Sequence, residues 1–270
     1  MSIAGYHRVL ALYDWEENIS LSRQYAFILG LVDQSGVRPT KAGFFFNEKK
    51  GKTRKERRRT FRSREALVRT LSELSGYDGF ELCDPIDGNF TNVSSDMSFD
   101  QNGLKRKYAV SRDVSEFSIE KAISHVRLFC MKLTPRYGFS IVGPNFDISC
   151  LAAGITTTGM ERETSFRTSA LGASLLFGKQ HLKGRVADVF GLNILSEVHL
   201  AQDIDGQSLA DWIVSGRHGT LTIITDRVAV WTVPKEIRQS VRARLWRSGM
   251  FIDDNQPEIF KLNLSHITPA

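Results

Sequence analysis

Apolar residues return every three or four positions in four segments of the chain, which is the spacing of one face of an α-helix. The clearest segment runs from Ile119 to Leu133, and Ser118 precedes it as a candidate N-cap. Pro135 and Gly138 follow and should end this helix. The four predicted helices cover about 20–32, 63–76, 118–133 and 234–249.

Shorter runs rich in β-branched and aromatic residues lie between these helices and predict strands. They cover 8–13, 42–47, 79–83, 107–111, 139–143, 221–224 and 228–233. The last two are separated only by Thr225, Asp226 and Arg227, which suits a short hairpin, and Pro234 can begin the following helix. This alternation predicts an α/β or α+β fold, with a mixed β-sheet, helices packed on it and a C-terminal β-hairpin followed by a helix.

The 270 residues are enough for one large domain or two small ones. We find no repeat of fixed period and no low-complexity linker, and the polar stretch at 88–103 precedes the only region where the chain could divide. We therefore expect a single α/β domain over 1–270 built on one merged sheet. The alternative is two merged halves, about 1–110 and 111–270.

The composition, 41% hydrophobic and 24% charged, is typical of globular proteins and excludes disorder, collagen and coiled coil for the chain as a whole. The net charge of +6 is concentrated in one segment. Between Lys49 and Arg64, ten Lys or Arg and one acid, Glu56, give a charge of +9, which leaves −3 for the rest of the chain. We call 49–64 the basic strip. Its local charge indicates a local contact or a solvated hairpin rather than a broad electrostatic footprint.

The basic strip is expected to be exposed and mobile, because ten cations repel one another and are costly to bury unpaired. Three interpretations remain open: a solvated hairpin, a contact with an acidic protein partner, and non-specific nucleic-acid binding. Few aromatic residues support nucleic-acid binding, since only Phe61 and Phe46 could stack on bases.

The sequence has no run of about 18 to 20 apolar residues that could cross a membrane, and its first residues lack the features of a secretory leader. A cytoplasmic protein that does not enter membranes is expected. The three cysteines, Cys83, Cys130 and Cys150, are too few and too widely spaced for a disulfide framework or a C-x-x-C site, and they are expected to be buried thiols.

Motifs of the common enzyme classes are missing from the sequence, including phosphate-binding glycine loops, zincin motifs and the hydrolase nucleophile elbow. Ser118 and Lys121 match a bare S-x-x-K, although Ser118 is better explained as a helix cap. No two histidines have helical spacing, so neither a metal site nor a cofactor is predicted.

Glu197, His199 and Asp203 could serve acid–base chemistry if they met in a cleft. The competing interpretation is that Ser196 and Glu197 begin a helix while His199 is a surface or bridging residue.

The segment from Gly184 to Gly249 resembles the C-terminal half of bacterial immunity proteins of polymorphic-toxin systems, in particular the immunity protein 52 type. The matching runs are the Asn-Ile-Leu-Ser-Glu run at 193–197, the Gly-Thr-Leu start of a strand at 219–221, and Trp-Thr-Val-Pro at 231–234. Most of this pattern is scaffold, and Trp231 is expected in the core. The basic strip is a departure that we do not associate with the family.

The resemblance implies a protein without catalytic chemistry that binds a cognate effector toxin and neutralises it by occlusion. The leading hypothesis is therefore an immunity protein, not an enzyme. A nucleic-acid-binding or nuclease-associated protein that uses the basic strip is the alternative, and an enzyme that uses Glu197 and His199 comes third. The candidate partner-binding residues are Arg54, Arg57, Arg58, Arg59, Arg62, Glu197 and His199.

Overall fold

The computed structural model describes residues 6–16, 41–47, 54–60, 79–83, 90–96, 105–143 and 180–252, and single residues between 23 and 31 and at 66 and 69. Ten strands form one sheet: β1 (His7–Glu16), β2 (Lys41–Asn47), β3 (Arg54–Thr60), β4 (Gly79–Cys83), β5 (Phe90–Asp96), β6 (Lys105–Asp113), β7 (Thr134–Gly143), β8 (Leu192–Ser196), β11 (Thr220–Ile223) and β12 (Val228–Thr232).

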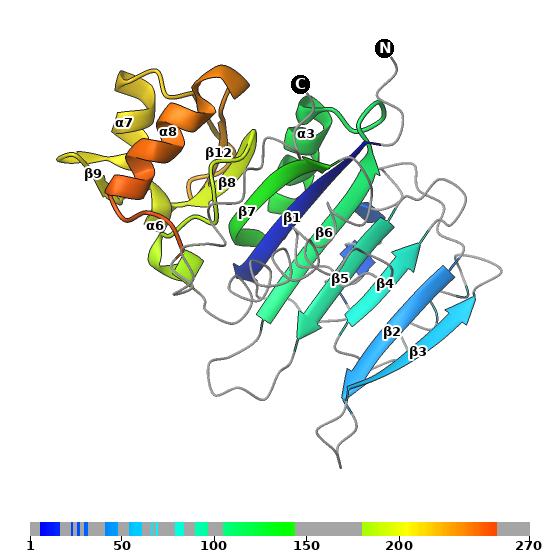
Figure 1. The fold of residues 1–270 in the computed structure, drawn as a ribbon. Coiled ribbons are helices and arrows are strands. Elements are labelled where there is room, and N and C mark those ends of the chain that lie inside the picture. The colour runs from blue at the N-terminus through cyan, green and yellow to red at the C-terminus, as the bar shows by residue number, and fades with distance from the viewer. Residues whose placement is uncertain are drawn as a thin grey trace.

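The strand order across this sheet is β11-β12-β8-β7-β1-β6-β5-β4-β2-β3, and neighbouring strands run antiparallel. Strands from the two halves of the sequence meet at the centre, where β1 lies between β6 and β7 (Figure 1). The α+β class predicted from the sequence is confirmed, but the described pairs are antiparallel rather than mixed. The polar stretch at 88–103 contains β5, so the sheet continues into it.

The continuous described ranges contain four α-helices: α3 (Ile119–Cys130), α6 (Glu197–Leu200), α7 (Leu209–Ser215) and α8 (Lys235–Arg247). Between α6 and α7, β9 (Asp203–Ile204) and β10 (Gln207–Ser208) form a small separate hairpin. A 3-10 helix, η1 (Gln180–Lys183), precedes β8. In Figure 1, α6, α7 and α8 gather around β8 and β12, while α3 lies behind β1 and β7.

The sheet divides the hydrophobic core into two layers. On one face, α3 packs Ala122, Val126 and Phe129 against alternate residues of β1, among them Leu10 and Leu12. On the other face, α7 and α8 pack against the intervening residues of the strands. Val9, Ala11, Phe139, Trp212, Trp231, Val241 and Leu245 belong to this second layer. Successive strand residues point to opposite faces, so one strand contributes to both layers.

The predicted cap of α3 is confirmed, because the Ser118 hydroxyl accepts a hydrogen bond from the backbone N–H of Lys121 at 3.3 Å. The predicted stop is wrong, because α3 ends at Cys130 and both Pro135 and Gly138 lie inside β7. A Cβ on Gly138 would come within 2.6 Å of the Ala11 carbonyl oxygen, so this glycine permits the close approach of β7 to β1.

The C-terminal hairpin and helix are confirmed. Trp231 is fully buried, and its indole N–H donates to the His218 carbonyl at 2.9 Å. Gly219 begins the hairpin at φ +115°, a conformation that favours glycine, and a Cβ there would lie 2.3 Å from the Thr232 carbonyl oxygen. Of the expected inward residues of α8, Val241 and Leu245 are buried and Ile237 is partly buried.

The predicted helices over about 20–32 and 63–76 lie mostly outside the described residues. Where 20–32 is described, Phe27 and Leu31 are helical and join the core layer that contains α3.

Candidate functional site

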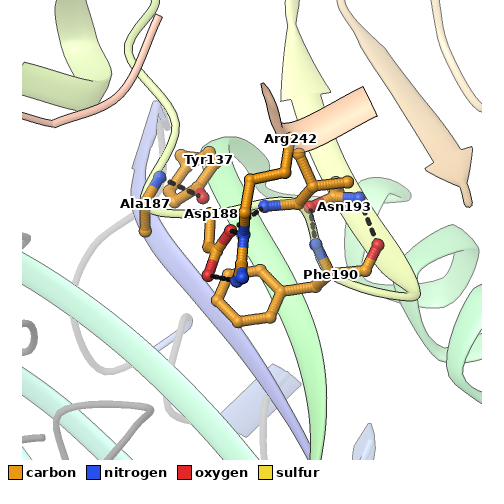
Figure 2. Close-up of polar contacts among 7 residues, drawn as sticks. Tyr137, Ala187, Asp188, Phe190, Asn193 and Arg242 are labelled. Atoms are coloured by element: carbon orange, nitrogen blue, oxygen red, sulfur yellow. Dashed lines mark hydrogen bonds and ion pairs between the residues drawn. The ribbon is translucent and has the colours of Figure 1, made fainter. Parts of the chain in front are cut away.

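The C-terminal part of the fold is anchored by a buried ion pair between Asp188 and Arg242 (Figure 2). The Asp188 side chain is 10% exposed, and Arg242 reaches it from α8 with two donors, one of them Nε at 2.6 Å from Oδ1. Burial raises the pKa of the Asp188 carboxyl above its ordinary value, while the Arg242 charge opposes this rise. The pair fixes α8 to the segment that enters β8.

Further polar contacts hold the same segment (Figure 2). The Tyr137 hydroxyl of β7 accepts from the Ala187 N–H at 2.8 Å. The Asn193 side chain accepts from the Phe190 N–H at 3.0 Å and donates to the Phe190 carbonyl at 2.8 Å. All these groups are buried, so they act as scaffold and are not available to a ligand.

Ser196 and His199 form a buried pair at the start of α6. Their exposed fractions are 2% and 0%, and the Ser196 hydroxyl lies 3.0 Å from His199 Nδ1. The same Nδ1 accepts the Ser196 backbone N–H at 3.4 Å, so the pair caps the helix, as the sequence analysis expected of Ser196. The expectation of a surface or bridging His199 is corrected, because its ring stacks on Tyr137 with centroids 5.3 Å apart. Burial, with His181 nearby, lowers the pKa of His199 to about 3.

Two other histidines form buried or partly buried polar pairs. His181 is fully buried, and its Nε2 lies 2.7 Å from Oδ2 of Asp14. On the opposite face of the sheet, His125 Nε2 lies 2.6 Å from the Tyr108 hydroxyl, and burial lowers the pKa of His125 to about 4. A nucleophile or general base must reach its substrate, and these pairs are enclosed by core side chains. They are suited to packing.

Glu197, next to the buried pair, faces solvent and joins two arginines. Arg136 Nη1 of β7 lies 3.1 Å from Glu197 Oε1, and Arg227 Nε of the hairpin turn lies 4.0 Å from the same oxygen. The side chains of Arg136, Glu197 and Arg227 are 25%, 45% and 47% exposed. We call these three residues the strand-end cluster, because they lie where β7 and β12 begin and β8 ends. Exposed ion pairs stabilise a fold by only about 0–1 kcal/mol, so this cluster can exchange partners at little cost.

Ile223 lies close in sequence to the cluster, at the end of β11, and its side chain is 63% exposed. Val214, in α7, is 67% exposed, and α7 contacts β11. Exposed apolar side chains beside arginines are typical of the surfaces that bind other proteins.

The backbone of the basic strip is described for 54–60, where it forms β3 and pairs with β2 over seven residues. The strip was predicted to be exposed and mobile, and a solvated hairpin was one of its three interpretations. The backbone agrees with a hairpin, because β2 and β3 are consecutive antiparallel strands. Arg54, Arg57, Arg58 and Arg59 lie in β3, while Arg62 lies outside the described residues. The predicted exposure of the strip stays a prediction.

The candidate residues therefore do not form one site. Seven strand spacings separate β8, which precedes Glu197, from β3, a distance of roughly 30 Å at the usual spacing between strands. His199 adjoins Glu197 but has no exposed surface. The sequence analysis missed Arg136, whose role depends on β7 and β8 being neighbours, and Arg227, which it assigned only to a turn.

No group of three or more His, Cys, Asp or Glu side chains in the described part of the chain could hold a metal ion. None of the helices in the ranges given above is long and apolar enough to cross a membrane. Cys130 is only partly buried, short of the expected full burial, and this burial raises the pKa of its thiol to about 12. The side chains of Cys83 and Cys150 lie outside the described set.

Comparison with known proteins gives a structural likeness but no match in sequence. No protein-family model and no curated protein sequence matches the chain. The fold is similar to that of the Pseudomonas aeruginosa T6SS protein PA0821, with a TM-score of 0.57 and 12% sequence identity over 92% of this chain and 73% of that chain. At this identity the likeness establishes a shared fold.

Proposed function

We propose that this protein is an immunity protein that binds a cognate bacterial effector toxin and neutralises it by occlusion, without catalysis. The observation that carries the proposal is the contrast between buried and exposed chemistry in the C-terminal part of the fold. The pairs that could serve catalysis, such as Ser196 with His199, are buried. The strand-end cluster and Ile223, which suit protein binding, are exposed.

Two further observations support the proposal. The fold is similar to that of a protein described as a T6SS protein, which is compatible with an effector or immunity role. The residues from Gly184 to Gly249, which resemble immunity proteins, form the surface that carries Glu197, Arg227 and Ile223. An inhibitor that blocks a toxin needs a stable surface of complementary shape and charge. The Asp188–Arg242 ion pair stabilises the part of the fold that carries this surface.

We place the toxin-binding surface at the strand-end cluster rather than at the basic strip. The cluster combines two arginines, a carboxylate and a neighbouring exposed isoleucine, whereas the strip lies at the other edge of the sheet. Charged residues of an interface set association rate and partner choice, so reversal of the central carboxylate should have a large effect.

The experiment is co-expression of this chain with the toxin encoded beside it, with survival of the host as readout. Wild-type protein and His199→Ala should protect, provided that His199→Ala folds, because a buried side chain does not meet the toxin. Glu197→Arg should lose protection, because it removes the carboxylate that positions Arg136 and Arg227 in the cluster, while a melting curve checks that it is folded. Failure of the wild-type chain to protect would refute the proposed function.

A further inference from the structure

The two outer strands of the sheet differ in chemistry. β3, at one edge, has the sequence RKERRRT, in which six of seven residues are charged. β11, at the other edge, has the sequence TLTI, which has no charged residue and no proline. Its register with β12 is regular, without a bulge. Charge, proline and bulges are the usual means by which proteins prevent a sheet edge from pairing with another chain, so β3 is protected and β11 is not.

The hydrogen-bonding pattern identifies the free backbone groups of β11. The Ile224 N–H donates to the Val228 carbonyl at 2.9 Å, which makes 224 and 228 a hydrogen-bonded pair. Hydrogen-bonded pairs alternate with non-bonded pairs in antiparallel strands. The backbone N–H and C=O groups of Thr222 and Thr220 therefore also point toward β12. The N–H and C=O groups of Leu221 and Ile223 therefore point away from β12. Among the described strands, β11 has only β12 as a neighbour.

The side chains around β11 favour a partner strand with apolar residues. Leu221 packs against the core layer that contains α7 and α8, and Ile223 lies on the same face of the strand. Ile223 is 63% exposed, although lysine is the usual residue on an edge that avoids pairing. Val214 of α7, 67% exposed, adds apolar surface beside the strand.

The charges at the two ends of β11 indicate which kind of strand can pair with its free edge. Exposed Arg217 precedes β11, and Arg227, 47% exposed, follows it in the hairpin turn, where Asp226 is its neighbour and Glu197 its ion-pair partner. A cation therefore lies at each end of the strand, and at the turn end the exposed Arg227 can exchange Glu197 for an acidic group of a partner at little cost. A second copy paired antiparallel about Thr222 would place Arg217 of each copy opposite Arg227 of the other. That arrangement is repulsive, because like charges directly opposite each other destabilise a strand pair.

We propose that β11 is the edge at which the toxin docks, by adding an extended strand with alternating apolar residues and acidic flanks. This inference rests on the proposed function and specifies its binding mode. Main-chain hydrogen bonds to Leu221 and Ile223 hold the added strand, Ile223 and Val214 contact its side chains, and the two arginines select its acidic ends.

Amide exchange of the full chain, measured alone and with the purified toxin encoded beside it, tests the docking mode. The Leu221 and Ile223 amides should exchange rapidly in the free chain, the Thr222 amide slowly, and the first two should slow at least tenfold in the complex. A complex that leaves these amides unchanged would overturn the edge proposal and leave toxin binding intact. Slow exchange in the free chain would also overturn it, because a second copy or another segment of the chain would then occupy the edge; the mass in solution distinguishes these two.

Two substitutions add a test by affinity. Ile223→Pro removes an outward N–H and the isoleucine side chain without breaking a hydrogen bond to β12, because a proline is tolerated on the free side of an edge strand. It should raise the Kd for the toxin at least tenfold with little change in Tm. Ile223→Lys should do the same. The matched control is Met131→Lys, which places the same charge on a 69% exposed residue of the α3 face and should change the Kd less than twofold. Equal effects of the two lysines would contradict docking at β11, and absence of any wild-type complex would refute the proposed function together with this inference.

Discussion

Arg242 of α8 and Asp188, 54 residues earlier in the chain, form a two-donor ion pair that ties the last helix to the segment entering β8. Arg242→Met should lower the free energy of unfolding by about 3 kcal/mol at pH 7, because it removes both donors that contact the buried Asp188 carboxylate and leaves only the charge of Arg238 nearby. Urea denaturation measures the change. The control is Arg244→Met, which breaks the exposed pair with Asp205 and should cost less than about 1 kcal/mol.

The pH dependence of the stability lost in Arg242→Met, which we call its deficit, provides a second check on the ion pair. The pKa of Asp188 is raised in the folded chain, so its contribution to stability falls as the pH rises through that pKa, and Arg242 limits the loss. Without Arg242 the pKa should rise further. The deficit of Arg242→Met should therefore be smaller at pH 5 than at pH 7, and a deficit independent of pH would contradict a charged pair.

Two of the buried histidines, His125 and His199, should make the protein sensitive to acid. The pKa values of His125 and His199 fall to about 4 and about 3, below their ordinary value, so the unfolded chain binds more protons between pH 6.5 and these values. Stability should fall as the pH drops through this window, by up to about 1.4 kcal/mol per pH unit for each histidine. In His199→Asn, whose amide oxygen can replace Nδ1 as acceptor, this slope should be reduced near pH 5. An unchanged slope would show that His199 is accessible to protons in the folded state.

Trp231 should be among the most sensitive core positions. Trp231→Ala should lower the free energy of unfolding by about 3 to 5 kcal/mol through lost burial and a cavity. Trp231→Phe should be milder, and its cost of about 1 kcal/mol comes mainly from the lost hydrogen bond to the His218 carbonyl. Trp246→Ala, at a half-exposed tryptophan, is the control and should change stability by less than 1 kcal/mol, on the order expected of surface positions. Similar melting midpoints for the two alanine variants would contradict the placement of Trp231 in the core.

The sequence predicted the elements whose apolar residues follow a clear period. The helix at 118–133 and the hairpin at 221–233 were found because α3 and β12 bury regular faces. β3 and β5 were missed because they are strongly charged or polar, and their strand conformation depends on pairing with neighbours rather than on local preference.

The candidate site was predictable only in part, for a similar reason. Glu197 was singled out by its neighbours in sequence, but its partner Arg136 lies 61 residues away and becomes adjacent only when β7 pairs with β8. The burial of His199 depends on Tyr137, which no spacing in the sequence links to it.

The charges of β3 are expected to protect a sheet edge rather than to bind the toxin. Replacing Arg57, Arg58 and Arg59 with threonine keeps strand propensity and removes three positive charges, so the variant should self-associate more strongly than wild type in light scattering. Its affinity for the toxin should be unchanged. Loss of a salt-sensitive toxin complex would instead place the basic strip in the interface, and loss of affinity for bulk RNA or DNA would favour the nucleic-acid alternative.

A titration of toxin activity with this protein tests neutralisation by occlusion most directly. A fixed amount of the toxin encoded beside the chain, well above the Kd, receives increasing amounts of the full-length protein. The account predicts that toxin activity falls linearly and reaches zero at one equivalent, and that active toxin is recovered when the complex is dissociated. Inactivation of many toxin molecules by one molecule of this protein, or undiminished toxin activity at several equivalents, would contradict it.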